Sequence, residues 1–277
     1  MDVLYLIERE CKRRGYSPRT IQTYCSCVRR FFKWRWKEPR CITRKDIQDF
    51  IDVLVDSGAS GSTMNVYVNA LKFLMQEILC KRVLLRVKHS KVPKRLPVVL
   101  SKDEVKLLIG AIGNPTHRLM VELMYSAGLR VSELVTLKKE DVEISRGLGW
   151  VRQGKGSKDR MFVIARKIQE SLSKHIEENC HGNDAHDSWV FAGRKGRHIH
   201  IRSPQEIVKK AAKKAGIAKD VHCHTLRHSF ATHLIEDGYS IMAVQNALGH
   251  SDPNTTMVYV HVAKPKMVDI TSPYDRL

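Results

Sequence analysis

Hydrophobic positions in the first 80 residues recur at helical spacing. Gly15 ends the first helical segment, and Ser17 with Pro18 supplies an N-cap and a first-turn proline for the next. Thr43 is placed to cap a third helix that ends near Gly58. The apolar positions of the four segments are Leu4, Ile7 and Cys11; Ile21, Cys25, Val28 and Phe32; Ile47, Phe50, Ile51 and Leu54; and Tyr67, Leu71, Leu74 and Ile78. This pattern predicts a bundle of four short helices.

Residues 81–97 interrupt the helical pattern. Pro93 and Pro97 resist helix formation, and the segment contains no acidic residue. Its basic residues are Lys81, Arg82, Arg86, Lys88, Lys91, Lys94 and Arg95. The composition is typical of a solvated linker and would also suit a chain lying along a phosphate backbone. We interpret the segment as an interdomain linker.

The helical pattern restarts at Ser101, which forms a capping-box sequence with Glu104. A following apolar helix ends at Gly128, and further helices are predicted over about 166–179, 204–215, 225–237 and 241–248. Residues 142–165 alternate between apolar and polar positions around a glycine-rich tip, which predicts a β-hairpin or small meander. The second part of the chain is therefore expected to be mostly helical with a small antiparallel sheet.

The charge balance of the chain gives information about its binding partner rather than about its fold. The chain has 48 Lys+Arg against 29 Asp+Glu, a formal net charge of +19, and both sides of Pro97 are basic. Such an excess favours nucleic acid first and an acidic membrane surface second. The N-terminus lacks the pattern of a signal peptide, no stretch matches a membrane span, and the seven cysteines form no CxxC pair. We therefore expect an intracellular protein with reduced thiols.

Five histidines gather between residues 222 and 250. They are His222, His224, His228, His233 and His250. His224 and His228 are one helical turn apart, as zinc ligands often are, but no carboxylate or cysteine completes a familiar ligand spacing. A metal site and plain structural histidines both fit this pattern.

Two arginines near these histidines favour a phosphate site. Arg227 shares a helix face with His224 near a predicted helix start, where a guanidinium can bind phosphate oxygens in a forked geometry. Arg130 follows a helix-ending glycine and has Glu133 three residues on as a partner for a buried charge. A surface arginine and a structural ion pair are the plain alternatives.

Lys155 and Tyr259 complete a set of groups suited to phosphoryl transfer. Lys155 lies between two glycines at the hairpin tip, and Tyr259 lies among apolar residues. Taken alone, the first is a solvated lysine and the second a half-buried tyrosine. With a reference pKa of about 10, a tyrosine becomes a nucleophile only if cations stabilise its developing charge or a base takes its proton. Together with two arginines and the histidines, the set needs no metal.

These motifs resemble those of the tyrosine recombinases of the Xer and integron-integrase type. The matching stretches, in the order of that family, are residues 128–134 (GLRVSEL), 154–160, 224–233 (HTLRHSFATH) and 248–250 (LGH), followed by Thr255, Thr256 and Tyr259. The first domain resembles the family's core-binding domain mainly through Ser17, Pro18, Thr20 and Tyr24. The resemblance implies a mainly α fold: a four-helix SAM-like core-binding domain at 1–80, a basic linker at 81–97, and a mostly helical catalytic domain at 98–277 with a small antiparallel β-sheet.

The resemblance also implies a reaction. Tyr259 would attack one DNA strand and become joined to the 3′ phosphate, which releases a 5′ hydroxyl. The other implied roles are Arg130 and Arg227 as the phosphate clamp, Lys155 as the general acid, His224 as a hydrogen-bonding acid/base, His250 as a donor to the phosphate, and Glu133 as the group that orients Arg130 or His224. No cofactor and no metal would be needed, because the arginines supply the counter-charge.

The partners implied are double-stranded DNA with a specific recombination site, a homotetramer on two sites, and in some systems an accessory DNA translocase or architectural protein. No membrane is involved, and the expected location is the nucleoid in the cytoplasm. DNA contacts are expected from Arg29, Arg30, Lys33, Lys88, Lys91, Lys94, Arg95, Lys158 and Arg160. Resolution of chromosome or plasmid dimers and integration or excision of a mobile element both remain open.

Three rival functions remain open from the residues alone. Residues 225–249 also resemble a helix-turn-helix, which would suit a DNA-binding regulator without catalysis. The histidines would suit a metal-dependent nuclease, and a type IB topoisomerase shares the attack chemistry. The tail after Tyr259 is short and contains Pro265 and Pro273, so no long C-terminal helix is expected; its residues 271–274 resemble integron integrases.

Overall fold

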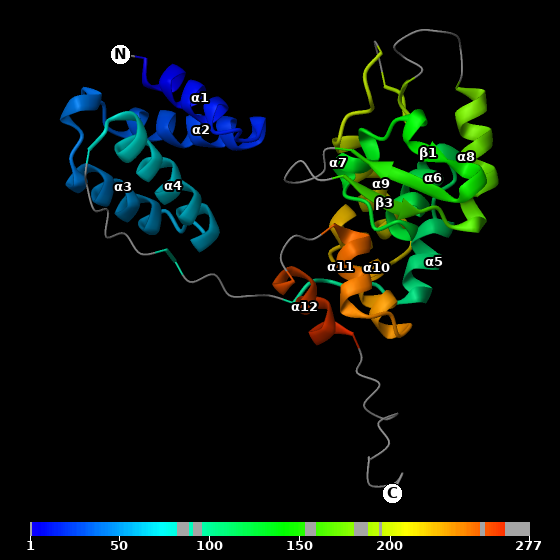
Figure 1. Ribbon diagram of the computed structural model, residues 1–277. Coiled ribbons are helices and arrows are strands. Elements are labelled where there is room, and N and C mark those ends of the chain that lie inside the picture. Colours follow the sequence, from blue (N-terminus) through cyan, green and yellow to red (C-terminus); the bar gives the residue numbers. More distant parts are fainter. Residues whose placement is uncertain are drawn as a thin grey trace, which may run out of the picture. The chain divides into compact units, whose positions relative to one another are not determined.

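The computed structural model describes residues 2–81, 89–90, 96–152, 159–179, 188–193, 196–249 and 253–263 (Figure 1). The chain forms two compact units, residues 1–94 and 95–277. Each unit has its own cluster of buried apolar side chains. In the part of the chain that is described, no helix combines the length and apolarity that a bilayer crossing requires.

The first unit is built from helices. They are α1 (Val3–Arg13), α2 (Pro18–Trp34), the 3-10 turn η1 (Pro39–Cys41), α3 (Arg44–Asp56), α4 (Gly61–Phe73) and the π-helical turn η2 (Leu74–Ile78). The hydroxyl of Ser17 accepts the backbone N–H of Thr20, and Thr43 forms a reciprocal capping box with Asp46. The four predicted helices are confirmed, although the fourth changes to π geometry after Phe73.

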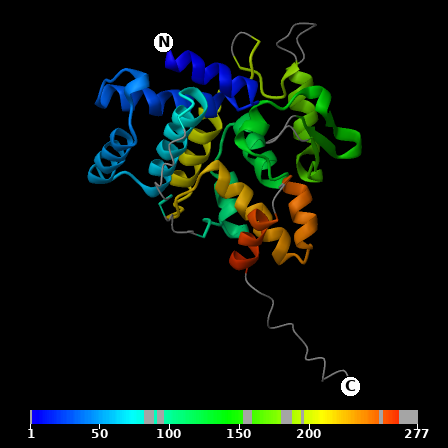
Figure 2. The same cartoon turned by 60° about the vertical axis from the view of Figure 1, so that its left-hand side comes forward.

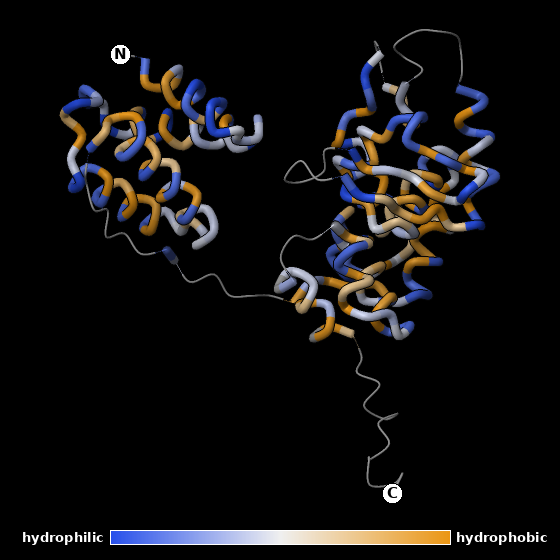
Figure 3. Tube along the Cα trace, in the orientation of Figure 1, coloured by the Kyte–Doolittle hydropathy of each residue, from blue (hydrophilic) through white to orange (hydrophobic). Residues whose placement is uncertain are grey.

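Aromatic rings form the centre of this first unit. Phe31 and Phe50 are almost completely buried, and their ring centroids lie 5.3 Å apart in an edge-to-face arrangement. Figure 3 shows hydrophobic and hydrophilic positions alternating along the helices of this unit. Three of the expected DNA contacts, Arg29, Arg30 and Lys33, are exposed on α2.

The second unit combines helices with a small sheet. Its helices are α5 (Lys102–Gly110), α6 (Pro115–Ser126), α7 (Val131–Val135), the 3-10 turns η3 (Lys139–Asp141) and η4 (Ile144–Arg146), α8 (Arg166–Glu178), α9 (Arg202–Lys214), α10 (Cys223–Glu236), α11 (Ile241–Leu248) and α12 (Asn254–Val262). Strands β1 (Val142–Glu143), β2 (Leu148–Val151) and β3 (Arg160–Val163) form an antiparallel sheet in the order β1-β2-β3. Trp150 pairs with Met161 in the β2–β3 register. The predicted meander is confirmed, while its tip lies outside the described residues.

Helix α10 is in contact with several other helices of the second unit. It packs against α6, α9, α11 and α12, and both views show α12 beside α10 and α11 (Figures 1 and 2). Most helices of this unit bury one apolar stripe, but α10 also buries polar side chains, including Thr225, Arg227 and His233. Burying a polar group costs free energy unless it is hydrogen-bonded. The partners of these side chains therefore indicate the role of α10.

Candidate active site

A buried carboxylate organises the turn between α6 and α7. Gly128 ends α6 with a φ of +59°, and a side chain there would collide with Phe230. This turn places Arg130 directly before α7, and Glu133 lies in the first turn of that helix with 7% of its surface exposed. The backbone N–H of Arg130 donates to Glu133 Oε2 at 2.9 Å, and Arg130 Nη1 donates to Oε1 at 2.6 Å. The pairing expected from the spacing is therefore present.

Arg160 binds the same carboxylate from strand β3. Its Nη2 donates to Glu133 Oε2 at 2.6 Å, and its Nη1 donates to the carbonyl oxygen of Ala247 at 2.8 Å. Gly249 follows α11 with a φ of +62°, and a Cβ there would lie 2.5 Å from Arg160 Cδ. Arg160 was expected to contact DNA, but its side chain is 8% exposed and its guanidinium is engaged inside the protein. Arg160 thus joins β3 to α7 and α11, and its contact with DNA stays a prediction.

Arg227 of α10 is the most deeply buried cation of the site. Its two terminal nitrogens donate to the carbonyl oxygens of Gly128 and Leu248, both at 2.6 Å. These carbonyls lie at the C-terminal ends of α6 and α11, where backbone C=O groups lack intrahelical hydrogen-bond partners. Arg227 Nη1 also lies 3.7 Å from Glu133 Oε2. Burial and the neighbouring Arg130 lower the pKa of Arg227 to about 10, which keeps it charged at neutral pH.

The site carries more positive than negative charge. Three guanidinium groups, those of Arg130, Arg160 and Arg227, surround the carboxylate of Glu133, and within the described residues of the site they outnumber it. Burial by itself would raise the pKa of Glu133, but Arg160 and the backbone N–H of Arg130 outweigh it and hold the pKa below its ordinary value. Glu133 is thus ionised at neutral pH, and the remaining positive charge favours an anion such as a phosphate.

His224 lies one turn before Arg227, in the first turn of α10. Burial, followed by the charges of Arg227 and Arg130, lowers its pKa below the ordinary histidine value. The ring is therefore neutral at pH 7 and can both donate and accept a hydrogen bond. Its ring centroid is 6.3 Å from that of His228, one turn further along the helix.

Tyr259 reaches the site from α12. Its side chain is 3% exposed, and its hydroxyl oxygen lies 3.0 Å from Nδ1 of His228. Burial raises the pKa of Tyr259, while the positive charges of Arg227 and Arg130 act in the opposite direction. The phenol is therefore neutral in the free protein, and it lies within the electrostatic reach of both arginines of the proposed phosphate clamp.

The structure therefore brings together five residues chosen from the sequence: Arg130, Glu133, His224, Arg227 and Tyr259. Seven others lie outside the described residues: Lys88, Lys91, Lys94, Arg95, Lys155, Lys158 and His250. Sequence reasoning did not assign a role to His228, whose only signal was its place one residue after Arg227 and one turn after His224. The buried role of Arg160 had a clearer signal, because strand alternation puts it on the same face as Phe162.

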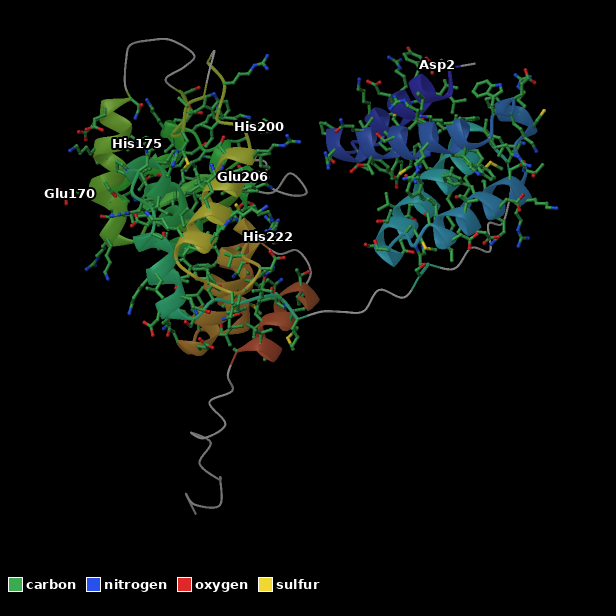
Figure 4. The ribbon with its side chains drawn as sticks, turned by 180° about the vertical axis from the view of Figure 1, so that it is seen from behind. Asp2, Glu170, His175, His200, Glu206 and His222 are labelled. Carbon is green, nitrogen blue, oxygen red and sulfur yellow. The ribbon has the colours of Figure 1, made fainter. Side chains whose placement is uncertain are left out.

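The metal interpretation of the histidines finds no geometric support in the described ranges. Within them, no group of three or more His, Cys, Asp or Glu side chains is arranged to hold an ion. Figure 4 labels His175, His200 and His222, which come from separate parts of the second unit. His224 and His228 instead lie beside arginines and a tyrosine.

Comparison with known proteins gives matches over both units. Residues 98–266 match the model of the phage integrase family, and residues 4–83 match the N-terminal SAM-like domain of phage integrases. The tyrosine recombinase XerA of Thermococcus kodakarensis is 38% identical over 253 residues, which cover 90% of this chain and 86% of that protein.

Solved structures show the same fold. The XerH site-specific recombinase bound to a palindromic difH substrate, in a post-cleavage complex, gives a TM-score of 0.75 at 24% identity, with 98% of this chain and 85% of that chain covered. A lambda integrase tetramer bound to a Holliday junction gives 0.74 at 20% identity, with 93% and 76% covered.

Proposed function

Because the chain belongs to the phage integrase family of tyrosine recombinases, it is a site-specific recombinase that cuts and rejoins DNA through a 3′-phosphotyrosine, and we propose that Tyr259 is its nucleophile. One observation carries the assignment most strongly. The Tyr259 hydroxyl is held in the same buried site as Arg130 and Arg227, whose charges oppose the rise in its pKa. A phenol that develops negative charge there is stabilised by both cations.

The reaction follows from these groups. The Tyr259 oxygen attacks the scissile phosphorus, a bond from tyrosine to the 3′ phosphate forms, and the bond to the 5′ oxygen breaks. The 5′ oxygen leaves as a hydroxyl after it receives a proton. A 5′ hydroxyl from another duplex then reverses the step. The phosphodiester bond energy is conserved in the tyrosine ester, so the exchange needs no nucleotide hydrolysis.

Arg130 and Arg227 neutralise the non-bridging oxygens of the phosphate in this proposal. By analogy with oxyanion holes, each preorganised donor contributes about 3–4 kcal/mol of barrier reduction. Glu133 and Arg160 act behind them: the carboxylate holds Arg130, and Arg160 holds the carboxylate. The arginines supply the counter-charge that a metal would provide in other phosphoryl-transfer sites.

Further roles come from the family motifs. Lys155 is proposed as the general acid for the leaving 5′ oxygen, His224 as a hydrogen-bonding acid/base, and His250 as a donor to the phosphate. Residues 1–80 are proposed as the core-binding domain and residues 98–277 as the catalytic domain, with 81–97 as the linker. DNA contacts are proposed for the exposed Arg29, Arg30 and Lys33 of α2 and for Lys88, Lys91, Lys94, Arg95 and Lys158.

The proposed assembly is a homotetramer on two copies of a specific double-stranded site in the nucleoid. The lambda integrase tetramer on a Holliday junction, which shares the fold, supports this arrangement. An accessory DNA translocase or architectural protein is an additional proposed partner. The relatives named Xer favour resolution of chromosome or plasmid dimers, and the phage integrase relationship favours integration or excision of a mobile element. Membership of this family argues against two of the rival functions, a DNA-binding regulator without catalysis and a metal-dependent nuclease.

The test begins with a duplex selected by the protein from a randomised DNA library. A nick placed beside the cleavage point lets the short 5′-hydroxyl fragment diffuse away, so a covalent adduct accumulates. The wild-type protein should form an adduct that survives denaturation by SDS. The Tyr259→Phe variant should bind the same duplex and form none. An adduct that persists in this variant would overturn the assignment.

A further inference from the structure

The hydrogen bond between Tyr259 and His228 has no part in the roles carried over from the family. His228 Nδ1 lies 3.0 Å from the Tyr259 hydroxyl oxygen, and the two ring centroids are 5.6 Å apart. His228 comes from α10 and Tyr259 from α12, so tertiary packing brings the two groups together. A base must lie within about 2.6–3.2 Å of the oxygen whose proton it removes, and this pair meets that requirement.

The protonation states set the direction of transfer. Burial, together with the neighbouring His224 and Arg227, lowers the pKa of His228 to about 4, so its ring is neutral at pH 7. Tyr259 carries its proton there, because burial raises the pKa of its hydroxyl. With the histidine proton on Nε2, Nδ1 accepts a hydrogen bond from the Tyr259 O–H.

We propose, on the basis of the proposed function of Tyr259, that His228 is a further catalytic residue: the general base that takes the phenol proton during attack. As the tyrosine oxygen forms its bond to phosphorus, the O–H proton moves to His228 Nδ1. The bond from phosphorus to the 5′ oxygen breaks, and that oxygen takes a different proton from the general acid. During rejoining, the incoming 5′ hydroxyl gives its proton to the deprotonated general acid and its oxygen bonds to phosphorus; the bond from phosphorus to Tyr259 breaks, and His228 returns the proton to the phenol.

The charges around His228 make this base responsive to the substrate. The groups that face it are His224 and Arg227 on its own helix and Tyr259 on α12. In the empty site the positive charge of Arg227 opposes protonation of His228. A bound phosphate brings negative charge beside the arginines and offsets this opposition. His228 thus becomes a stronger base when DNA occupies the site, which restrains activation of Tyr259 in the free protein.

The same helix contains a matched control pair. His233 Nδ1 lies 2.9 Å from the Tyr125 hydroxyl oxygen, which is the same atom pairing, with an interplanar angle of 78° against 46° for His228 and Tyr259. The charged groups that act on His233 are Glu236, Lys102 and Asp237, so none of the site arginines is among them. A substitution at His233 therefore tests the structural part of a buried histidine–tyrosine hydrogen bond.

The decisive variant is His228→Asn, because the asparagine oxygen can accept from Tyr259 but cannot take its proton. DNA binding should be unchanged, and single-turnover cleavage should fall about 10²–10⁴-fold. Wild-type cleavage should be nearly flat from pH 6 to pH 8, whereas the variant should gain about tenfold per pH unit because hydroxide must replace the base. His233→Asn should keep the wild-type pH profile. His228→Gln provides a second variant, and DNA binding reports whether each protein is folded.

A substrate with sulfur in place of the bridging 5′ oxygen separates base from acid. Sulfur leaves without protonation, so the Lys155→Ala variant should recover cleavage while His228→Asn should remain slow. If His228→Asn also recovers cleavage on this substrate, His228 acts on the leaving group and the proposal is overturned. A wild-type rate and pH profile in both His228 variants would overturn it as well. An adduct formed by Tyr259→Phe would instead overturn the proposed function itself.

Discussion

Arg160 donates from Nη2 to the Oε2 atom of Glu133 at 2.6 Å, and this contact joins strand β3 to the first turn of α7. The same carboxylate binds Arg130 through its other oxygen. The position of Arg130, a guanidinium proposed to clamp the scissile phosphate, therefore depends on a carboxylate that Arg160 also holds. Arg160 thus fixes the carboxylate of Glu133, and Glu133 in turn holds the side chain of Arg130.

The first prediction concerns this buried ion pair. Replacement of Arg160 by alanine leaves Glu133 buried with fewer partners, and the free energy of unfolding should fall by about 3–5 kcal/mol. Urea unfolding measures the change. Arg146→Ala is the control, because its ion pair with Glu143 is exposed and screened by solvent, so its loss should change the free energy of unfolding far less. Equal losses in the two variants would contradict a special role for the buried pair.

The second prediction concerns stability below neutral pH. Burial, with His224 and Arg227, lowers the pKa of His228 to about 4, whereas an unfolded histidine titrates near about 6.5. Between these values the unfolded chain binds a proton that the folded chain does not, so stability decreases as the pH falls through that window. Unfolding free energies at pH 7 and pH 5 should differ less in His228→Asn than in the wild type. A difference of the same size in both would show that His228 is not buried as a neutral ring.

These two predictions depend on contacts that the sequence alone could not supply. Helix limits were predictable because caps are local: Ser17, Thr43 and Ser101 each bind a backbone N–H three residues away. The contact between Arg160 and Glu133 spans 27 residues of sequence and requires β3 to pack beside α7. Motif spacing could select the residues of the site, but it could not show which of them face one another.

The same limit explains why His228 was overlooked. Its neighbour Arg227 has chemistry that is recognisable from residue type and spacing, whereas the role of His228 depends on where α12 packs. The hydrogen bond to Tyr259 joins residues 31 positions apart. No local pattern determines which of several histidines in α10 receives that hydroxyl, and His233 makes an equivalent bond to Tyr125.

The third prediction concerns salt. If DNA binding neutralises 6–10 phosphates, affinity should fall about 10³–10⁵-fold between 50 mM and 200 mM salt. Arg29→Ala and Lys33→Ala should each reduce the slope of log affinity against log salt by about 0.9 if each side chain contacts one phosphate. Lys174→Ala, at an exposed position of α8, is the control. Unchanged slopes in the α2 variants would remove that helix from the DNA interface.

The fourth prediction concerns metal ions. Arginine counter-charge and a tyrosine nucleophile should make cleavage insensitive to a chelator such as EDTA. Adduct formation on the nicked duplex should proceed at the same rate with and without it. Loss of adduct on chelation, with recovery on addition of a divalent cation, would place a metal in the reaction and contradict the role given to Arg130 and Arg227.

The most direct measurement identifies the side chain that becomes bonded to DNA. The adduct formed on the nicked duplex can be digested with protease and nuclease, and mass spectrometry then locates the residual nucleotide on a peptide. The account predicts a 3′-nucleotide on the hydroxyl of Tyr259 and on no other residue. A nucleotide joined to a different tyrosine, or to a serine or histidine, would contradict it.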